Sequence, residues 1–147
     1  MSVSARNLGR IVRTIWSTQL GLELEECESE TLEHRLAHEE TIEIEVKFSG
    51  AFSGALVQRC SHQVSIMAAS CAFSTRNGDL GSTEVRDVLA EIAHMTAGNL
   101  KTILPGHSEL SFPNAIDPDE DTGNLVAEAG FELQGEPLIV RLTSQND

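Results

Sequence analysis

Apolar residues recur at helical spacing in three segments of the chain. The first lies between residues 8 and 16, where apolar side chains stand three and four apart. The second, "HQVSIMAASCAF" at 62–73, has the same spacing and follows Ser61, a residue type that caps helix N-termini well. The third and longest contains "DVLAEIAHMTAGNLKTIL", 87–104, and is expected to stop at Pro105 and Gly106. The pattern therefore predicts three helices.

Strands are predicted where apolar and polar residues alternate with a period of two. The segments with this pattern, or with a short apolar run, are 21–26 ("GLELEE"), 41–50 ("TIEIEVKFSG"), 54–60 ("GALVQRC"), 108–116, 124–133 and 137–143. The last two are joined at Gln134-Gly135, a turn signal. Helices and strands together predict one α+β domain, with an antiparallel-rich sheet of about six strands packed with three helices.

The composition excludes several classes of partner. The formal net charge is −13 at pH 7, which repels nucleic-acid phosphates and anionic membranes. The chain has one Trp, five Phe and no Tyr, so side chains that stack on single-stranded nucleic acid are scarce. No apolar run reaches the roughly 20 residues of a membrane helix, and polar residues interrupt the start of the chain where a signal peptide would be apolar. We therefore expect a cytoplasmic protein that binds neither nucleic acid nor membrane.

Two patterns that resemble metal sites are interpreted as ordinary surface. Segment 117–128 has spaced acidic residues, but its glycine stands one position later than in an EF-hand loop, and strand patterns flank it. His34 and His38 are four apart in an acidic connector, without the glutamate placement of a zinc protease. The three cysteines lack paired spacing and are expected to be buried free thiols. No metal or cofactor of the chain's own is expected.

The longest predicted helix carries a polar stripe. At about 100° of rotation per residue, Asp87, Glu91, His94 and Gly98 gather on one side. A solvated face explains much of this, because acidic residues near the N-terminus and Lys101 near the C-terminus suit the helix dipole. Gly98 is less easily explained, since glycine inside a helix costs about 1 kcal/mol relative to alanine. The apolar side is expected to consist of Val85, Leu89, Ile92, Thr96 and Ile103.

The stripe and the strand after it match a family pattern. Asp87, Glu91 and Gly98 keep the spacing of a helix of the form D-x3-E-x2-N with a glycine four residues after the Asn. Ser111 and Pro113, in "LSFP", supply the S-x-P of the following strand. On these residues the chain resembles the CheX branch of the CheC/CheX/FliY chemotaxis phosphatases. The resemblance covers roughly residues 48–116 and implies a single CheX-like domain over 1–147.

The resemblance implies a phosphatase that hydrolyses the aspartyl phosphate of a CheY-like response regulator in two-component or chemotaxis signalling. In the family the Glu reaches the regulator's lysine, the Asn aligns the attacking water, and the regulator supplies the metal ion, here expected to be Mg²⁺. Carried over, Glu91 is the docking carboxylate, and Asp87 and Gly98 belong to the partner-binding surface. The expected partner is thus a phosphorylated CheY-like regulator, and the resemblance also allows a homodimer joined through sheet edges.

His94 stands where the family has its water-positioning Asn. A neutral imidazole can hold a water through one ring nitrogen, but it lacks the paired donor and acceptor of an amide. It can also act as a general base or, when protonated, attract phosphoryl oxygens. Its bulk can equally prevent turnover. Two expectations therefore stand: a phosphatase in which Glu91 and His94 are catalytic, or a catalytically silent module that binds a response regulator or another signalling protein.

Overall fold

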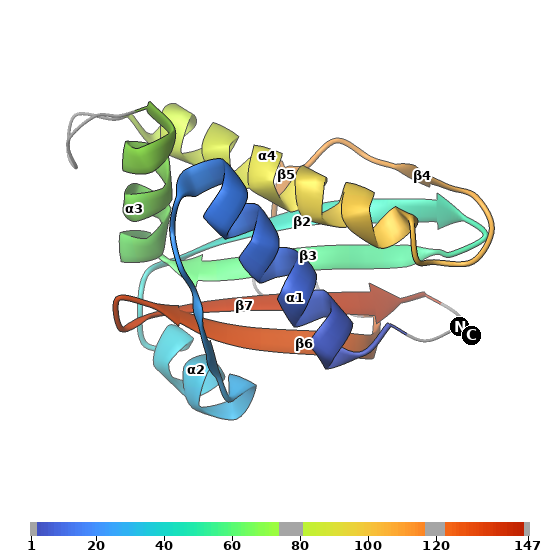
Figure 1. Cartoon of the computed structure of the whole chain (residues 1–147), viewed down its shortest axis with the longest axis horizontal. Helices are drawn as coiled ribbons and strands as arrows, with labels where there is room; N and C mark the ends of the chain where they lie inside the picture. The colour runs from blue at the N-terminus through green and yellow to red at the C-terminus, as the bar shows by residue number, and fades with distance from the viewer. Residues whose placement is uncertain (1–2, 74–80, 117–122, 146–147) are drawn as a thin grey trace.

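One antiparallel sheet organises the molecule (Figure 1). The structure is a computed structural model that describes residues 3–73, 81–116 and 123–145. Over these residues seven strands pair in the order β1-β6-β7-β3-β2-β4, and β5 pairs with β2 farther along the same edge. The strands are β1 (Glu25–Cys27), β2 (Thr41–Gly50), β3 (Gly54–Ser61), β4 (Ser108–Leu110), β5 (Asn114–Ala115), β6 (Asn124–Leu133) and β7 (Glu136–Ser144).

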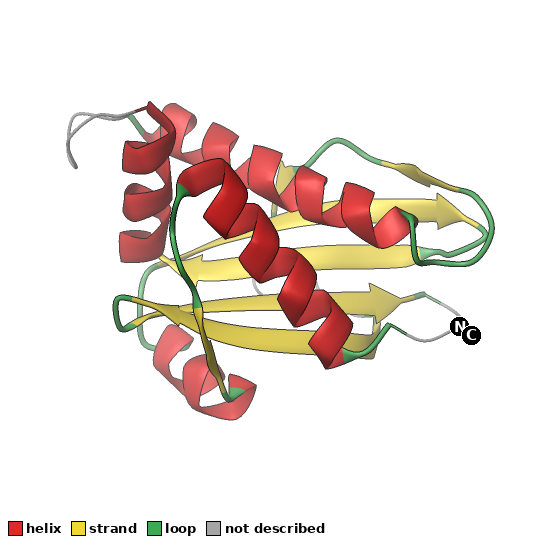
Figure 2. Cartoon of the chain, viewed as in Figure 1, coloured by secondary structure: helices red, strands yellow, loops and turns green. Residues whose placement is uncertain are grey.

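Three long helices cover one face of this sheet (Figure 2). They are α1 (Ala5–Ile15), α3 (His62–Phe73) and α4 (Ser82–Lys101). A π-helical turn, η1 (Trp16–Leu20), continues α1 and ends at Gly21, whose φ of 68° places it in the left-handed region. Among the described helices, none combines the length and the apolar character needed to cross a membrane.

The main core lies between the sheet and these three helices. Alternate residues of a strand point to opposite faces, so Ile44, Val46 and Phe48 of β2 enter the core from one side of the strand. Trp16 is fully buried in the same cluster, as the apolar spacing of the first helix predicts. The α+β class and the antiparallel sheet are therefore confirmed, and three of the elements, β2, β6 and α3, have the residue bounds expected from their patterns.

A fourth helix, α2 (Ser29–Leu36), lies where an acidic connector was expected, so the prediction of three helices was wrong. Its sequence, "SETLEHRL", contains only two apolar residues, Leu32 and Leu36, too few to show a helical period. Both are buried with Ile139 in a small separate cluster. Ile139 alternates with core residues of β7, so α2 packs against the face of the sheet opposite to the three long helices.

The expected strand over 108–116 is also corrected, because it forms two short strands, β4 and β5, rather than one. Pro113 lies between them and has no backbone N–H to donate to a ladder, which favours a break at that point. The strand expected over 21–26 is shorter and later, over Glu25–Cys27. Among the described strands it pairs with β6 alone, for example through Glu26 opposite Phe131. Over the described residues the sheet thus has seven strands rather than about six.

Candidate functional site

The α4 helix, which carries the polar stripe, is well defined at both ends. At its start the Glu84 carboxylate accepts a hydrogen bond of 3.0 Å from the backbone N–H of Gly81, the N-cap residue. At its end the Thr102 hydroxyl donates to the carbonyl of Asn99 over 2.7 Å. The helix therefore stops at Lys101, before the Pro105-Gly106 stop expected from the sequence. Its buried residues are Val85, Val88, Leu89, Ile92, Ala93, Thr96, Ala97 and Leu100.

Side-chain hydrogen bonds add to this packing. The Gln58 amide, on β3, donates to the carbonyl of Leu89 over 3.3 Å, and Gln58 itself is buried. The Thr96 hydroxyl donates to the carbonyl of Ile92 over 2.9 Å. Because the buried side of α4 packs into the core and Gln58 ties the helix to β3, its exposed side is a well-supported surface. Ile103, expected on the buried side, lies beyond the helix end and is 42% exposed, so that prediction was wrong.

The exposed side of α4 brings the four predicted site residues together. Asp87, Glu91 and His94 are exposed, and Gly98 is half-buried one turn farther along. Within the described part of the chain, none of the three polar side chains makes a hydrogen bond or ion pair. Their donors and acceptors are therefore available to another molecule. We call Asp87, Glu91, His94 and Gly98 the row on α4. A rigid set of polar groups without partners of their own is what a docking surface requires.

Gly98 is not required by contacts within the chain. A Cβ atom built on it meets no described heavy atom within 4 Å, so alanine would fit there. Gly9, the glycine inside α1, would by contrast bring its Cβ to 3.8 Å from the Phe131 ring, an ordinary van der Waals contact. The helix thus carries the roughly 1 kcal/mol cost of Gly98 without a packing reason of its own.

The strand motif "LSFP" does not join the row on α4. Ser111 bonds to the edge of β2: its backbone N–H donates to the carbonyl of Lys47, and its hydroxyl accepts from the N–H of Lys47, both over 2.9 Å. These bonds give Ser111 a structural role in holding the segment between β4 and β5 to the sheet. Phe112, between Ser111 and Pro113, is 88% exposed.

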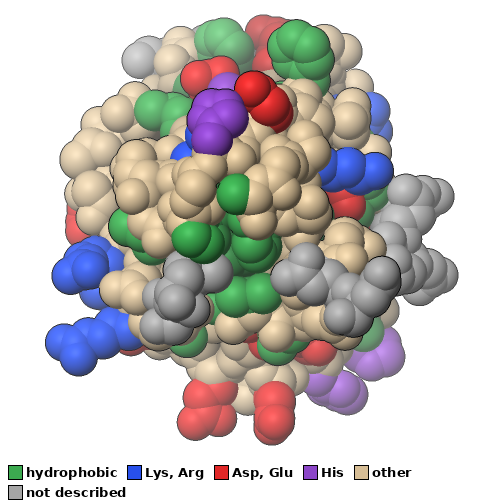
Figure 3. All heavy atoms as spheres, turned by 90° about the vertical axis from the view of Figure 1, so that its right-hand side faces the viewer, with side chains coloured by type: hydrophobic (Ala, Val, Ile, Leu, Met, Phe, Trp, Pro, Cys, Tyr) green, Lys and Arg blue, Asp and Glu red, His purple; other side chains and the backbone are tan. Residues whose placement is uncertain are grey.

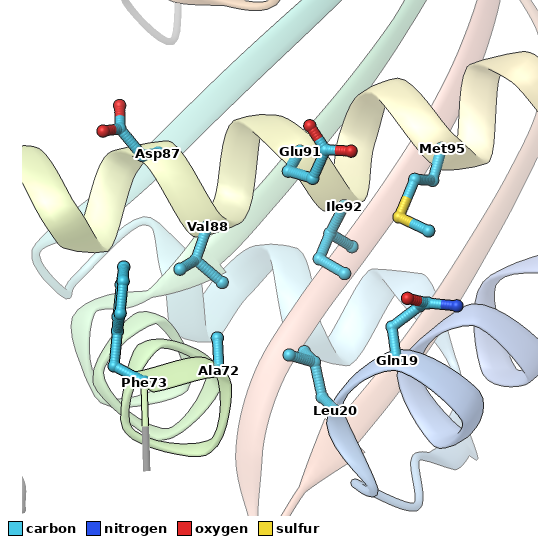
Figure 4. A pocket seen from close by; sticks show the side chains of 9 residues that line it. All are labelled: Gln19, Leu20, Ala72, Phe73, Asp87, Val88, Glu91, Ile92 and Met95. Atoms are coloured by element: carbon cyan, nitrogen blue, oxygen red, sulfur yellow. The ribbon is translucent and has the colours of Figure 1, made fainter. Parts of the chain in front are cut away.

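An apolar pocket beside the row was not foreseen from the sequence. It encloses about 250 Å³ between α4, the end of α3 and the π-helical turn η1. Figure 4 shows Val88, Ile92 and Met95 pointing from α4 toward Phe73 on α3 and Leu20 on η1. The sequence offers one sign of an apolar surface here, namely Phe73 at the end of a predicted helix, and the structure shows that Phe73 is exposed. The sequence does not show that folding brings η1 next to it.

The described residues offer no obvious metal centre. Over residues 3–73, 81–116 and 123–145, no group of three or more His, Cys, Asp or Glu side chains could hold an ion. His34 and His38 lie exposed at and just beyond the end of α2, with ring centroids 5.2 Å apart. Of the acidic segment 117–128, residues 117–122 lie outside the described part, and Glu128 pairs with Arg141 over 2.6 Å.

The face seen in Figure 3 shows basic side chains scattered rather than gathered into one patch.

The cysteines differ in exposure, contrary to the expectation that all three are buried. Cys60 is buried, Cys27 is half-buried and Cys71 is exposed, and all are free thiols. Burial raises the pKa of the Cys60 thiol to about 12, because an apolar environment disfavours the thiolate. Cys60 therefore stays protonated and unreactive at neutral pH.

A family model for the chemotaxis phosphatase CheX matches residues 43–131 of this chain. The match includes most of β2 and the whole of β3, α3 and α4, and thus all four residues of the row. No curated protein matches the sequence.

Solved structures with the same fold include a chemotaxis protein CheX from Vibrio vulnificus, with a TM-score of 0.73, 16% identity and 92% of each chain covered. A CheC-like superfamily protein from a Shewanella species has a TM-score of 0.77 at 12% identity, over 99% of this chain and 100% of the other. CheX of Borrelia burgdorferi, solved in a complex with CheY, BeF3 and Mg²⁺, has a TM-score of 0.72 at 14% identity, over 95% and 96% of the two chains.

Proposed function

This chain belongs to the CheX family, and from that premise we propose that it is a phosphatase that hydrolyses the aspartyl phosphate of a CheY-like response regulator. The observation that carries the proposal is the row of exposed, unpaired side chains on α4 with an open glycine at its end. A rigid helix of this kind can be inserted against a partner's active site without rearranging its own fold.

The reaction places modest demands on the enzyme. An acyl phosphate is already activated, so a water held in line with the phosphorus is the main requirement. The water oxygen attacks the phosphorus, the bond from phosphorus to the carboxylate oxygen breaks, and its electron pair stays on the regulator's aspartate. The products are free aspartate and inorganic phosphate. A divalent metal ion held by the regulator would supply positive charge at the phosphoryl oxygens, so the proposal assigns no metal ion to this chain.

Glu91 and Asp87 provide the docking charges in this proposal. Glu91 forms an ion pair with the lysine in the regulator's active site, and Asp87 extends the acidic surface by one helical turn. Gly98 lets the partner's backbone or phosphoryl group approach the helix, since no side chain stands there. The complex of a CheX with CheY in Borrelia burgdorferi supports the choice of a CheY-like partner.

His94 holds the attacking water in the proposed reaction. Three residues after Glu91, it projects from the same side of the helix. Its neutral ring can accept a hydrogen bond from the water through one nitrogen, and so align the water and take up its proton.

A second candidate is a module that binds the regulator without turnover. It is favoured by the state of His94, since no described residue bonds to either ring nitrogen. Catalytic imidazoles are usually oriented by a partner on the second nitrogen. In this case Glu91 and Asp87 would still dock, and the complex would sequester the regulator rather than dephosphorylate it.

Phosphate release from phosphorylated CheY-like receiver domains of the same organism separates the two candidates. The phosphatase predicts acceleration by wild type, loss on Glu91→Ala, and a strong reduction on His94→Ala. The silent module predicts binding without acceleration, and a gain of activity on His94→Asn. If no receiver domain is bound or dephosphorylated, both candidates are excluded.

A further inference from the structure

The apolar pocket beside the row has the size of a protein side chain rather than of a small ligand. Its volume of about 250 Å³ lies below the roughly 300–1,000 Å³ of pockets that enclose drug-sized molecules. Five of its lining residues have purely hydrocarbon side chains: Leu20, Ala72, Phe73, Val88 and Ile92. Phe73 is 45% exposed, so an aromatic wall of the pocket faces solvent when the chain is alone.

The pocket and the row on α4 form one continuous surface. Asp87 and Glu91 belong to the row and are also among the residues that line the pocket. Figure 4 shows their carboxylates on the side of α4 away from Val88, Ile92 and Met95, which point inward. About 100° per residue separates Glu91 from Ile92 and Asp87 from Val88 around the helix. A partner that reaches Glu91 therefore meets the mouth of the pocket within the same contact area.

The third wall depends on an uncommon backbone feature. The chain enters a π-helical turn, η1, at Trp16 and ends it at Gly21. This turn places Gln19 and Leu20 opposite Val88 and Ile92 of α4. π-Helical turns are rare and are frequent at functional sites, because they change the direction of side chains at a local cost in hydrogen bonding.

We propose that this pocket receives an apolar side chain of the regulator's receiver domain, one that stands beside a lysine or arginine. The apolar lining selects the side chain, and the unpaired carboxylates of Asp87 and Glu91 select the adjacent cation. Residues buried in a central pocket commonly dominate the energy of an interface. The pocket then decides which of several receiver domains the chain binds, a choice that the docking carboxylates alone cannot make. This inference rests on the proposed function, since it takes the same partner.

One truncation inside the pocket and one control truncation outside it test the proposal. The probe is a CheY-like receiver domain of the same organism, loaded with beryllium fluoride and Mg²⁺, with its affinity for the chain measured by calorimetry. Phe73→Ala removes the exposed wall and is expected to weaken binding by roughly tenfold. Leu125→Ala is the control, because Leu125 is 59% exposed on β6 and does not line the pocket. It is expected to leave the affinity within about twofold.

The outcomes separate this inference from the function on which it rests. If wild type binds the receiver domain and Phe73→Ala behaves like Leu125→Ala, the pocket is not a contact, while the proposed function stands. If wild type binds no receiver domain, the proposed function is refuted, and so is this inference, because it takes the same partner. Thermal unfolding of both variants shows whether either has lost its fold.

The methyl resonances of the methionines show, without any substitution in the chain, whether the receiver domain occupies the pocket. Met95 lines the pocket and Met67 does not, so the receiver domain is expected to shift the Met95 methyl signal and leave Met67 nearly unchanged. A Met95 shift that depends on the concentration of this chain alone would show a second copy as the occupant and overturn the proposal. No Met95 shift on saturation with the receiver domain would overturn it as well.

Discussion

Two charged regions of this protein treat their side chains in opposite ways. On the face of the sheet covered by α2, the Arg141 guanidinium bonds to carboxylates of both Glu33 and Glu128, the latter over 2.6 Å. On α4, Asp87 and Glu91 are exposed and have no partner within the described part of the chain. Both regions are rich in carboxylates. Those beside α2 are paired with Arg141, whereas those on α4 have no cationic partner within the described part of the chain.

The difference indicates a structural use of charge around Arg141 and, in the proposed function, a use of charge for binding on α4. Arg141 is partly buried, with 29% of its side chain exposed, and its partners link α2, β6 and β7. Such a network fixes one element against another and has no remaining capacity to bind. Unpaired carboxylates on a rigid helix contribute little to stability, but they keep their full attraction for a cation from outside. Substitutions in the two regions should therefore affect different measurements.

The largest effect is expected from Glu91→Ala. In the proposed function Glu91 pairs with the regulator's lysine. Loss of its carboxylate should then cost about 2–5 kcal/mol of complex stability, and regulator dephosphorylation should fall on the order of 100-fold. The melting temperature should hardly change, because Glu91 makes no interaction within the described chain. Glu39→Ala, an exposed glutamate just beyond α2, is the matched control and should leave the rate unchanged. An equal loss of dephosphorylation rate in both variants would contradict a special role for the row on α4.

Arg141→Ala should have the reverse profile. It leaves Glu33 and Glu128 without their shared cation, and we expect the free energy of unfolding to fall by about 1–3 kcal/mol. Denaturant titration measures this change. Arg13→Ala is the comparison, because the Arg13–Glu26 pair is largely exposed and should contribute less than about 1 kcal/mol. Regulator dephosphorylation by folded Arg141→Ala should match wild type, and a large loss there would contradict the division between the regions.

Gly98→Ala sharpens the comparison within one helix. Because the added Cβ meets no atom of another described segment within 4 Å, the substitution should raise the free energy of unfolding by about 1 kcal/mol. Binding of the receiver domain should nevertheless weaken, since the methyl group occupies the space left for the partner. Gly9→Ala, inside α1, should give a similar gain in stability with unchanged binding. If Gly98→Ala binds as well as wild type, close approach at this position is refuted.

The smallest effect concerns Cys60, whose charge is suppressed rather than paired or exposed. Its pKa is raised from 9.0 to about 12 in the folded chain, so the unfolded chain loses its proton first as the pH rises. Stability from this group is complete below pH 9 and is lost progressively between pH 9 and 12. At pH 9.5 the loss should stay below about 1 kcal/mol. Denaturant titrations at pH 8 and 9.5 measure it, and Cys60→Ala should show a smaller dependence on pH.

Strong local patterns predicted the elements that have them. The alternation of "TIEIEVKFSG" gave a strand over Thr41–Gly50, and the spacing of "HQVSIMAASCAF" gave a helix over His62–Phe73. Ser61 caps that helix as expected, accepting a bond of 3.3 Å from the N–H of Val64. In these segments the pattern of burial and the local propensity favour the same structure.

The elements whose local sequence patterns are weak were not predicted correctly. The helix α2 has only Leu32 and Leu36 as apolar residues, and it forms because Ile139 of β7 offers them a place to be buried. Over 108–116 the edge of β2 decides the outcome, since Ser111 bonds to Lys47 while the residues on either side of it form separate short strands. Both cases depend on residues far away along the chain.

The sequence alone determined the α+β class, the family resemblance and the spacing of Asp87, Glu91, His94 and Gly98, because these follow from the order of residues along one helix and its neighbouring strands. Only the tertiary structure decided that the side chains of Asp87, Glu91 and His94 have no partner among the described residues and that Gly98 meets no described atom. The pocket that joins η1, α3 and α4 belongs to the same group. Pairing and open space depend on what the rest of the fold places nearby, and helical periodicity carries no information about that.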